Sequence, residues 1–140
     1  GYGSDRYINE LKRLAATLSI TDNVAFKGGI AREERVPIYD SYEYFILPSL
    51  SENFGIAVLE ALSRGCKVLV SKRTPWQDCK HPGLTLFEPD HGSICIALKS
   101  ALAGAKVTPV IAVKSDFDLD GFRWENIALE FHSAYFDKRK

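Results

Sequence analysis

The chain has 140 residues, of which 46% are hydrophobic and 26% are charged. This is the composition of one globular domain and not of a disordered, fibrous or membrane polypeptide. Lys and Arg (18) balance Asp and Glu (18), so the formal net charge is zero. Because no long-range field attracts polyanions, we expect no nucleic-acid partner.

The cysteine pattern and the hydropathy bear on the cellular compartment. Cys66, Cys79 and Cys95 lie far apart and form no Cys-x-x-Cys pair, so we expect free thiols in a reducing compartment. No run approaches the roughly 18 apolar residues that a membrane span needs. The first residues lack the basic-then-apolar pattern of a secretory signal. We therefore expect a cytoplasmic location.

The first third of the chain reads as helix, strand and helix. Apolar residues at helical spacing predict an amphipathic helix over residues 5–18. Residues 24–26 form a short strand-like run, which Gly28 and the glycine after it stop. A polar, helical pattern follows over residues 32–42, where Pro37 must lie in the first turn or the helix must begin late.

The remainder continues the alternation. Apolar runs at 44–47 and 68–70 are typical of strands buried on both faces, and a further short strand is expected at 84–87. We expect a helix over residues 54–64, ended by Gly65, and a loop opening at 74–76. Further helices are predicted at about 93–102 and 122–138, with a loop between them. Such alternation indicates an α/β fold, with a parallel sheet covered by helices on both faces.

Two carboxylates mark the segment after the first of these apolar runs. Open parallel sheets bind ligands at the carboxyl ends of their strands, which is where Glu52 is expected. Glu60 is the one charged residue among positions 54–62, on a helix that must pack against the sheet. An unpaired buried carboxylate costs several kcal/mol. Glu60 must therefore find a protein partner, lose its charge, bind the hydroxyls of a ligand, or lie at the rim and reach water.

Glu52 precedes a predicted helix start, where an exposed acidic residue is common because it complements the helix dipole. The neighbouring Phe54 and Gly55 favour a ligand site instead. Gly55 lets a ligand approach the first backbone N–H groups of the helix, which together with the dipole form an anion site. A phosphate would fit there.

These residues resemble the retaining glycosyltransferases of family 4, also called group 1, which have the GT-B fold. The signature reads Pro-Ser-x-x-Glu-x-Phe-Gly at 48–55 and Leu-Glu-Ala-Leu at 59–62, with seven residues between Glu52 and Glu60. Supporting motifs, in matching order, are Asn23-Val24-x-Phe26-x-Gly28, Gly65 followed by Val68-Leu69-Val70-Ser71, and Phe122-x-Trp124-Glu125-x-Ile127-Ala128. The resemblance implies a Rossmann-like sheet, the C-terminal, donor-binding half of such an enzyme.

The resemblance also implies roles. The enzyme would transfer a sugar with retention from a nucleotide-diphosphate sugar to an acceptor. Glu52 would be the catalytic residue at the donor sugar, Glu60 would bind the ribose, and the backbone N–H groups of residues 54–56 would hold the diphosphate or sugar. Residues 26–30 would border the nucleobase. The donor-binding residues implied in full are Gly3, Phe26, Gly28, Ile30, Asn53, Phe54, Gly55, Ile56 and Glu60.

The resemblance implies no bound metal and no further cofactor, since helix N-termini and basic side chains take the phosphate charge. We expect a UDP- or GDP-sugar as donor and a glycan or lipid-linked sugar as acceptor, in bacterial cell-surface polysaccharide synthesis. Association with the inner face of the membrane would belong to the acceptor domain. His81, His91 and His132 share no metal-ligand spacing.

Departures from the family pattern bear on completeness. Asn53 stands where the family often has Gly, and residues 74–78 replace a glycine-rich loop, with Trp76 as a lid or packing residue. The family's phosphate-binding Arg and Lys, its acceptor domain and the first two strands of the donor domain would precede residue 1. We therefore expect residues 1–140 to be a donor-binding fragment that is inactive alone.

Two alternatives share this fold. A non-catalytic nucleotide-binding or interaction module would have no use for Glu52, whereas a transferase needs a carboxylate at the sugar. A nucleotide-sugar 2-epimerase would form product without an acceptor.

Overall fold

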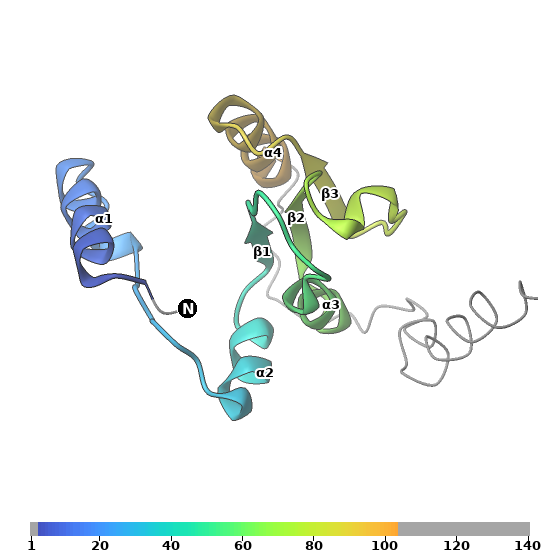
Figure 1. Cartoon of the computed structure of the whole chain (residues 1–140), viewed down its shortest axis with the longest axis horizontal. Coiled ribbons are helices and arrows are strands. Elements are labelled where there is room, and N and C mark those ends of the chain that lie inside the picture. Colours follow the sequence, from blue (N-terminus) through green and yellow to red (C-terminus); the bar gives the residue numbers. More distant parts are fainter. Residues whose placement is uncertain (1–2, 104–140) are drawn as a thin grey trace, which may run out of the picture. The chain divides into compact units, whose positions relative to one another are not determined.

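The structure, a computed structural model, describes residues 3–103. The chain forms two compact units, Gly1–Ile38 and Tyr39–Lys140, and each is described by itself. The elements are α1 (Asp5–Thr17), the 3₁₀ turn η1 (Thr21–Asn23), α2 (Arg32–Asp40), β1 (Tyr44–Leu47), α3 (Ile56–Ser63), β2 (Lys67–Ser71), the 3₁₀ turn η2 (Pro75–Asp78), β3 (Leu84–Phe87) and α4 (His91–Ala103). Figure 1 labels the α-helices and the strands.

The first unit contains α1, the amphipathic helix that the sequence predicts. Its N-cap is Ser4, whose hydroxyl accepts the Tyr7 N–H at 3.3 Å and so satisfies one of the unpaired N–H groups at the helix start. The helix ends at Thr17, and Ser19 then takes a left-handed conformation with φ 55°. Ala15 is buried in this unit.

Two expectations for the first unit are wrong. Residues 24–26 form no strand, and Val24 and Phe26 stay 38% and 43% exposed. A short β-prone run needs a neighbouring strand to take its hydrogen bonds, and the described residues of this unit contain none.

The second wrong expectation concerns α2. The helix begins at Arg32, so Pro37 lies inside it and not in its first turn. The Ala31 N–H donates to the Glu34 carboxylate at 3.1 Å, a cap that sets the start upstream of the proline. Pro37 removes one backbone hydrogen bond, but residues 31–37 are exposed and water can replace it.

The second unit contains the predicted parallel sheet, in the order β1-β2-β3. Val68 and Val70 point to one face, where they pack against Val58, Ala61 and Leu62 of α3. Leu69 points to the opposite face, where it packs with Phe87 of β3 and with Ala97 of α4. Figure 1 shows α3 and α4 on either side of β2. The α/β fold with helices on both faces is therefore confirmed.

The three strands differ in burial. In β2 the residues from Val68 to Ser71 are buried, which confirms the buried strand predicted at 68–70, and β2 is the central strand of the three. β1 was expected to be buried on both faces, but its residues are half-buried and Ile46 is 38% exposed. The reason is topological, because among the described residues β1 pairs with β2 alone.

Glycines and an aspartate set the ends of the helices in this unit. α3 begins at Ile56, later than predicted, because Gly55 before it takes the left-handed conformation with φ 74°. Gly65, with φ 80°, follows the last residues of α3 as expected. α4 begins at His91, since Asp90 caps it by accepting the Ser93 N–H at 2.9 Å. The bonds from Ser93 hold the pKa of Asp90 below its usual value.

The loop expected at residues 74–76 contains the turn η2, and the helix predicted over 122–138 lies outside the described residues. No helix among residues 3–103 has the length and apolar character that crossing a membrane requires.

Candidate functional site

Three loops leave the sheet at its carboxyl edge. Leu47 pairs with Val70, and Ser71 pairs with Phe87, so the strands end at the same edge. The loop after β1 contains Glu52 and leads into α3. The loop after β2 leads to η2, and the one after β3 to α4. This edge is where an open parallel sheet binds its ligands.

The loop after β1 is held partly by its own contacts. The Ser49 hydroxyl donates to the Ser51 carbonyl at 2.8 Å. Glu52 is half-buried, while Asn53 and Phe54 are exposed. The predicted catalytic residue thus lies half-buried at the carboxyl edge of the sheet.

Trp76 joins the second loop to the first. Its indole N–H donates to the Phe54 carbonyl at 2.6 Å, and the two rings meet edge to face with centroids 5.7 Å apart. A Cβ atom at Gly55 would lie 3.1 Å from the indole nitrogen. Trp76 is 3% exposed, which confirms the packing role and not that of a lid. Its contact with the site was missed, because no sequence pattern signals a bond across 22 positions.

The start of α3 is open. Gly55, the N-cap, has no side chain to accept an N–H, and its carbonyl accepts the Val58 N–H at 2.8 Å. The first N–H groups of any α-helix lack intrahelical acceptors, and the helix dipole adds partial positive charge there. Ile56 is 61% exposed. The arrangement can therefore receive an anion.

Glu60 lies further along α3 and has a protein partner. The Tyr39 hydroxyl donates to its Oε2 at 3.0 Å, and the Tyr39 ring meets Phe45 edge to face at 5.9 Å between centroids. Glu60 is half-buried. Of the outcomes open from the sequence, the structure shows the first: Glu60 is a half-buried carboxylate with a protein hydrogen-bond partner.

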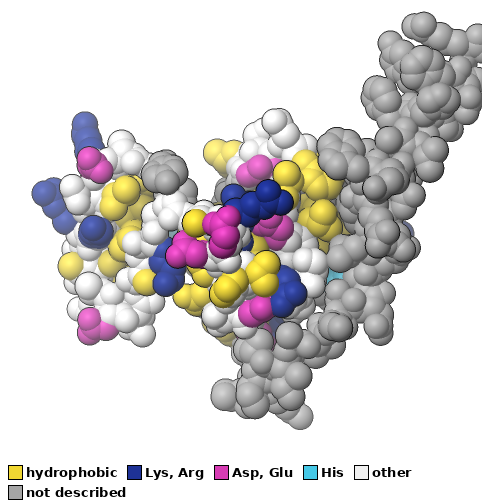
Figure 2. Space-filling model, turned by 90° about the horizontal axis from the view of Figure 1, so that it is seen from below, with side chains coloured by type: hydrophobic (Ala, Val, Ile, Leu, Met, Phe, Trp, Pro, Cys, Tyr) yellow, Lys and Arg dark blue, Asp and Glu magenta, His cyan; other side chains and the backbone are white. Residues whose placement is uncertain are grey.

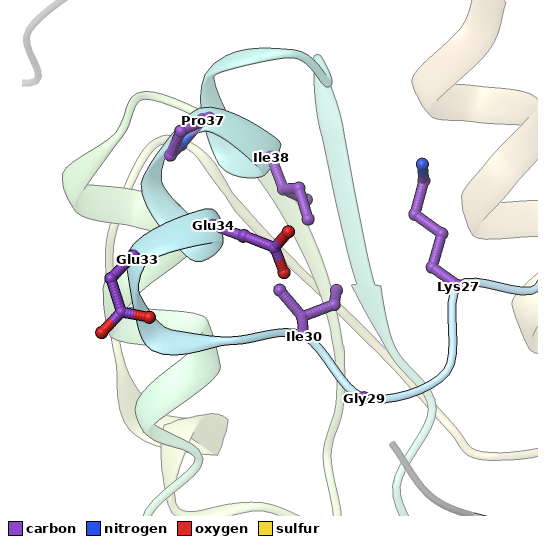
Figure 3. Close-up of a pocket in the computed structure, with 7 residues that line it drawn as sticks. All are labelled: Lys27, Gly29, Ile30, Glu33, Glu34, Pro37 and Ile38. Carbon is purple, nitrogen blue, oxygen red and sulfur yellow. The ribbon is translucent and has the colours of Figure 1, made fainter.

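The other predicted donor-binding residues belong to the first unit. Gly3 is exposed and lies just before α1, Phe26 is exposed, and Gly28 takes a left-handed conformation with φ 68°. Ile30 lines a pocket of about 540 Å³, whose remaining lining residues are Lys27, Gly29, Glu33, Glu34, Pro37 and Ile38. In Figure 3 the Glu34 carboxylate lies between Ile30 and Ile38, and the Lys27 side chain lies across the pocket from α2.

The predicted site residues thus fall into two groups. Residues 52–56 form one continuous loop and helix start, and Glu60 is on the same helix. Phe26, Gly28 and Ile30 share one short segment of the first unit, and Gly3 lies apart from them along the chain. The pocket beside Ile30 involves α2, which sequence reasoning did not connect with that segment.

Charged groups are paired around the second unit. At the carboxyl edge Lys72 and Glu88 form an ion pair at 3.1 Å. Away from it, Arg64 donates two hydrogen bonds to Asp40, at 2.7 and 2.6 Å, which hold the pKa of Asp40 below its usual value. Acidic and basic side chains are interspersed on the face in Figure 2.

Cysteines and metal ligands complete the inventory of reactive groups. All three cysteines are free thiols, as predicted. Burial raises the pKa of the Cys66 thiol. Within residues 3–103, no three His, Cys, Asp or Glu side chains gather in a cluster that could hold a metal ion. That the enzyme needs no metal stays a prediction.

Comparison with known proteins gives several relatives, and three of them match this chain over different lengths. The chain is 40% identical over 67 residues to the alpha-monoglucosyldiacylglycerol synthase of Streptococcus pneumoniae, covering 48% of this chain and 15% of the relative. It is 34% identical over 129 residues to the D-inositol 3-phosphate glycosyltransferase of Streptomyces coelicolor, covering 89% and 28%. It is 27% identical over 137 residues to an uncharacterized glycosyltransferase of Methanocaldococcus jannaschii, covering 95% and 35%. The chain thus spans about a third of these relatives or less.

A solved structure shares the fold. The sucrose-phosphate synthase of Thermosynechococcus elongatus superposes with a TM-score of 0.72 over 96% of this chain and 36% of its own, at 24% identity. This likeness identifies the parallel sheet and its helices as a Rossmann-like domain of the GT-B type.

The family model named "Glycosyl transferases group 1" matches residues 2–88, a range that includes parts of both units and every residue predicted to contact the donor. Since that match covers more than half of the sequence and the fold agrees with it, the chain belongs to the group 1 glycosyltransferases.

Proposed function

We propose that this chain binds a nucleotide-diphosphate sugar and forms the donor half-site of a retaining glycosyltransferase. The observation that carries the proposal is the segment at the carboxyl edge of the sheet, where Glu52 lies beside the open start of α3. A carboxylate next to a group of N–H donors suits a donor with a sugar on one side and a diphosphate on the other.

The chemistry is the departure of a nucleoside diphosphate. The bond between the anomeric carbon and the diphosphate oxygen breaks, and its electron pair leaves with the diphosphate. The N–H groups of residues 54–56 stabilise the growing negative charge, which is the electrostatic part of catalysis. Glu52 faces the sugar, which develops oxocarbenium character, and its carboxylate positions the sugar and stabilises positive charge. The acceptor hydroxyl then attacks the anomeric carbon from the face that the diphosphate leaves and passes its proton to the departing diphosphate oxygen, and the configuration is retained.

Glu60 would hold the ribose. Its Oε2 accepts a hydrogen bond from Tyr39, which fixes the orientation of the carboxylate on α3. A carboxylate is an acceptor-only group, the type of group that ribose hydroxyls donate to. We include a UDP- or GDP-sugar as donor, and no bound metal, in this proposal. The acceptor would be a glycan or lipid-linked sugar in bacterial cell-surface polysaccharide synthesis. One relative is named for making alpha-monoglucosyldiacylglycerol, a sugar-bearing lipid, which supports a lipid-linked acceptor.

A thermal-shift titration with UDP, GDP and ADP tests the nucleotide part. Selective binding stabilises the folded chain by RT ln(1 + [L]/Kd), about 2.7 kcal/mol at a hundred-fold excess over Kd. One nucleotide should raise the melting temperature, and Glu60→Gln should abolish most of the shift. The matched control is Glu43→Gln, since Glu43 is half-buried and paired with Lys67 at 2.7 Å before β1, at the opposite edge of the sheet. No shift with any nucleotide would refute the proposal.

Calorimetric titration of Glu52→Gln tests the role of the second carboxylate. A carboxylate that faces the sugar matters for the nucleotide sugar and not for the free nucleotide. The variant should therefore bind the nucleoside diphosphate as the unchanged chain does, but bind the corresponding nucleotide sugar more weakly. Equal affinity for the nucleotide sugar in both proteins would favour a non-catalytic nucleotide-binding module instead.

A further inference from the structure

We propose that Trp76 is a positioning residue that sets the orientation of the peptide between Phe54 and Gly55, and so directs the Gly55 N–H to the negative charge of the donor. The proposal rests on the proposed function above. It concerns residues of the second unit alone.

The indole is held rigidly where it meets this peptide. Trp76 belongs to the buried cluster that joins α3 to the sheet. The loop that carries it is tied to the end of β2, because the Thr74 hydroxyl donates to the Ser71 carbonyl at 2.8 Å and the Arg73 N–H donates to the Ser71 hydroxyl at 3.0 Å. From this anchored position the indole N–H reaches the Phe54 carbonyl at 2.6 Å.

The hydrogen bond from the indole to the Phe54 carbonyl fixes the direction of the Gly55 N–H, because both groups belong to one planar peptide. In a trans peptide the C=O and N–H bonds point in opposite directions. The Phe54 carbonyl points to Trp76, so the Gly55 N–H of the same peptide points away from Trp76. In a trans peptide the Cα of Gly55 lies on the same side of the C–N bond as the carbonyl oxygen, in agreement with the 3.1 Å between its hypothetical Cβ and the indole nitrogen.

Without the indole N–H, this peptide would have an alternative. Glycine accepts positive and negative φ almost equally, so the peptide before Gly55 can rotate as a unit. The rotated peptide would present the Phe54 carbonyl oxygen where the proposed diphosphate binds, and its partial negative charge would repel the ligand. A buried indole N–H needs an acceptor, so Trp76 holds the carbonyl on the inner side.

The test is Trp76→Phe, which removes the donor while keeping an aromatic ring for Phe54. Affinity for UDP or GDP, whichever the unchanged chain binds, should fall about ten-fold, the loss expected when one hydrogen bond to a charged group is no longer made. The matched control is Tyr44→Phe, which removes a hydroxyl that donates to the Ala101 carbonyl at 2.9 Å, a part-buried bond outside the site. The control should bind as the unchanged chain does.

The uncharged nucleoside separates positioning from general damage. Uridine or guanosine lacks the charge that the Gly55 N–H is proposed to meet, so its affinity should be the same in Trp76→Phe and in the unchanged chain. Equal weakening of nucleoside and nucleotide would mean a distorted fold and would overturn the proposal. Equal nucleotide affinity in both proteins would overturn it too.

Fluorescence gives an independent readout. The chain has two tryptophans, so Trp124→Phe leaves Trp76 as the one emitting indole. Binding of the nucleoside diphosphate should change its emission, and the nucleoside should not. Absence of any change at saturating nucleotide would contradict the proposal. If the unchanged chain binds no nucleotide, the proposed function fails and this inference fails with it, whereas nucleotide binding without dependence on Trp76 overturns this inference alone.

Discussion

Replacing Gly55 with alanine tests the packing of the loop before α3. Gly55 has φ 74° and ψ 52°, in the left-handed region. An L-residue with a Cβ pays about 1–2 kcal/mol there. The new Cβ would also lie 3.1 Å from the Trp76 Nε1 and 3.5 Å from its Cδ1.

Trp76 cannot move away easily. It is buried, and its N–H bond to the Phe54 carbonyl is already short at 2.6 Å. A shift of a few tenths of an ångström would stretch that bond and disturb the core. Together the two effects should lower the free energy of unfolding by roughly 1–3 kcal/mol.

Urea denaturation followed by far-ultraviolet circular dichroism measures this loss. Gly28→Ala is the control for the backbone cost, because Gly28 has φ 68° and no heavy atom of residues 3–103 lies within 4 Å of its hypothetical Cβ. Gly55→Ala should cost more than Gly28→Ala. Gly55→Ala should also lower the free energy of unfolding less in a chain that already carries Trp76→Phe than in the unchanged chain, since the smaller ring relieves the contact with the new Cβ. Equal costs for the two alanine variants, and no coupling to Trp76, would refute the reasoning.

Two further predictions concern titration and reactivity. The paired Arg64 holds the pKa of Asp40 below its unfolded value, so the contribution of this carboxylate to stability is full at neutral pH and is lost below about pH 4 as the pH falls through the folded pKa. Asp40→Asn should therefore have a lower free energy of unfolding than the unchanged chain at pH 7, and this free energy should fall less in the variant when the pH is lowered. Denaturant titrations that show the same fall in both proteins would contradict this. The Cys66 thiol is 4% exposed with a raised pKa, so pulsed alkylation followed by mass spectrometry should modify the half-buried Cys79 and Cys95 first. Modification of Cys66 as fast as either would show that this part of the core opens readily.

Local patterns in the sequence were enough to predict most of the second unit. The apolar runs that became β1, β2 and β3 and the glycine after α3 act through neighbours along the chain. Alternation of strands and helices then implies a parallel sheet, because parallel strands need crossover connections. The family signature around Glu52 and Glu60 is equally local, and the match over residues 2–88 confirmed the family.

Predictions failed where a local preference depended on a partner. Residues 24–26 have a strand-like composition, but a strand exists by pairing, and the described residues of the first unit provide no strand to pair with. The proline in α2 suggested a late start, but the Glu34 carboxylate capped the helix upstream of Pro37.

The contacts that shape the candidate site were decided by tertiary structure alone. Tyr39 donates to Glu60 across 21 positions, and Trp76 donates to the Phe54 carbonyl across 22. The sequence by itself determined the α/β class, the succession of strands and helices along the chain and the family, since these depend on periodicity, glycine placement and motif spacing. The order of the strands within the sheet came from the tertiary structure. Which hydrogen-bond donor lies within reach of which hydrogen-bond acceptor depends on how α3 and the loops pack on the sheet. No pattern of neighbouring residues encodes contacts between residues so far apart in the sequence.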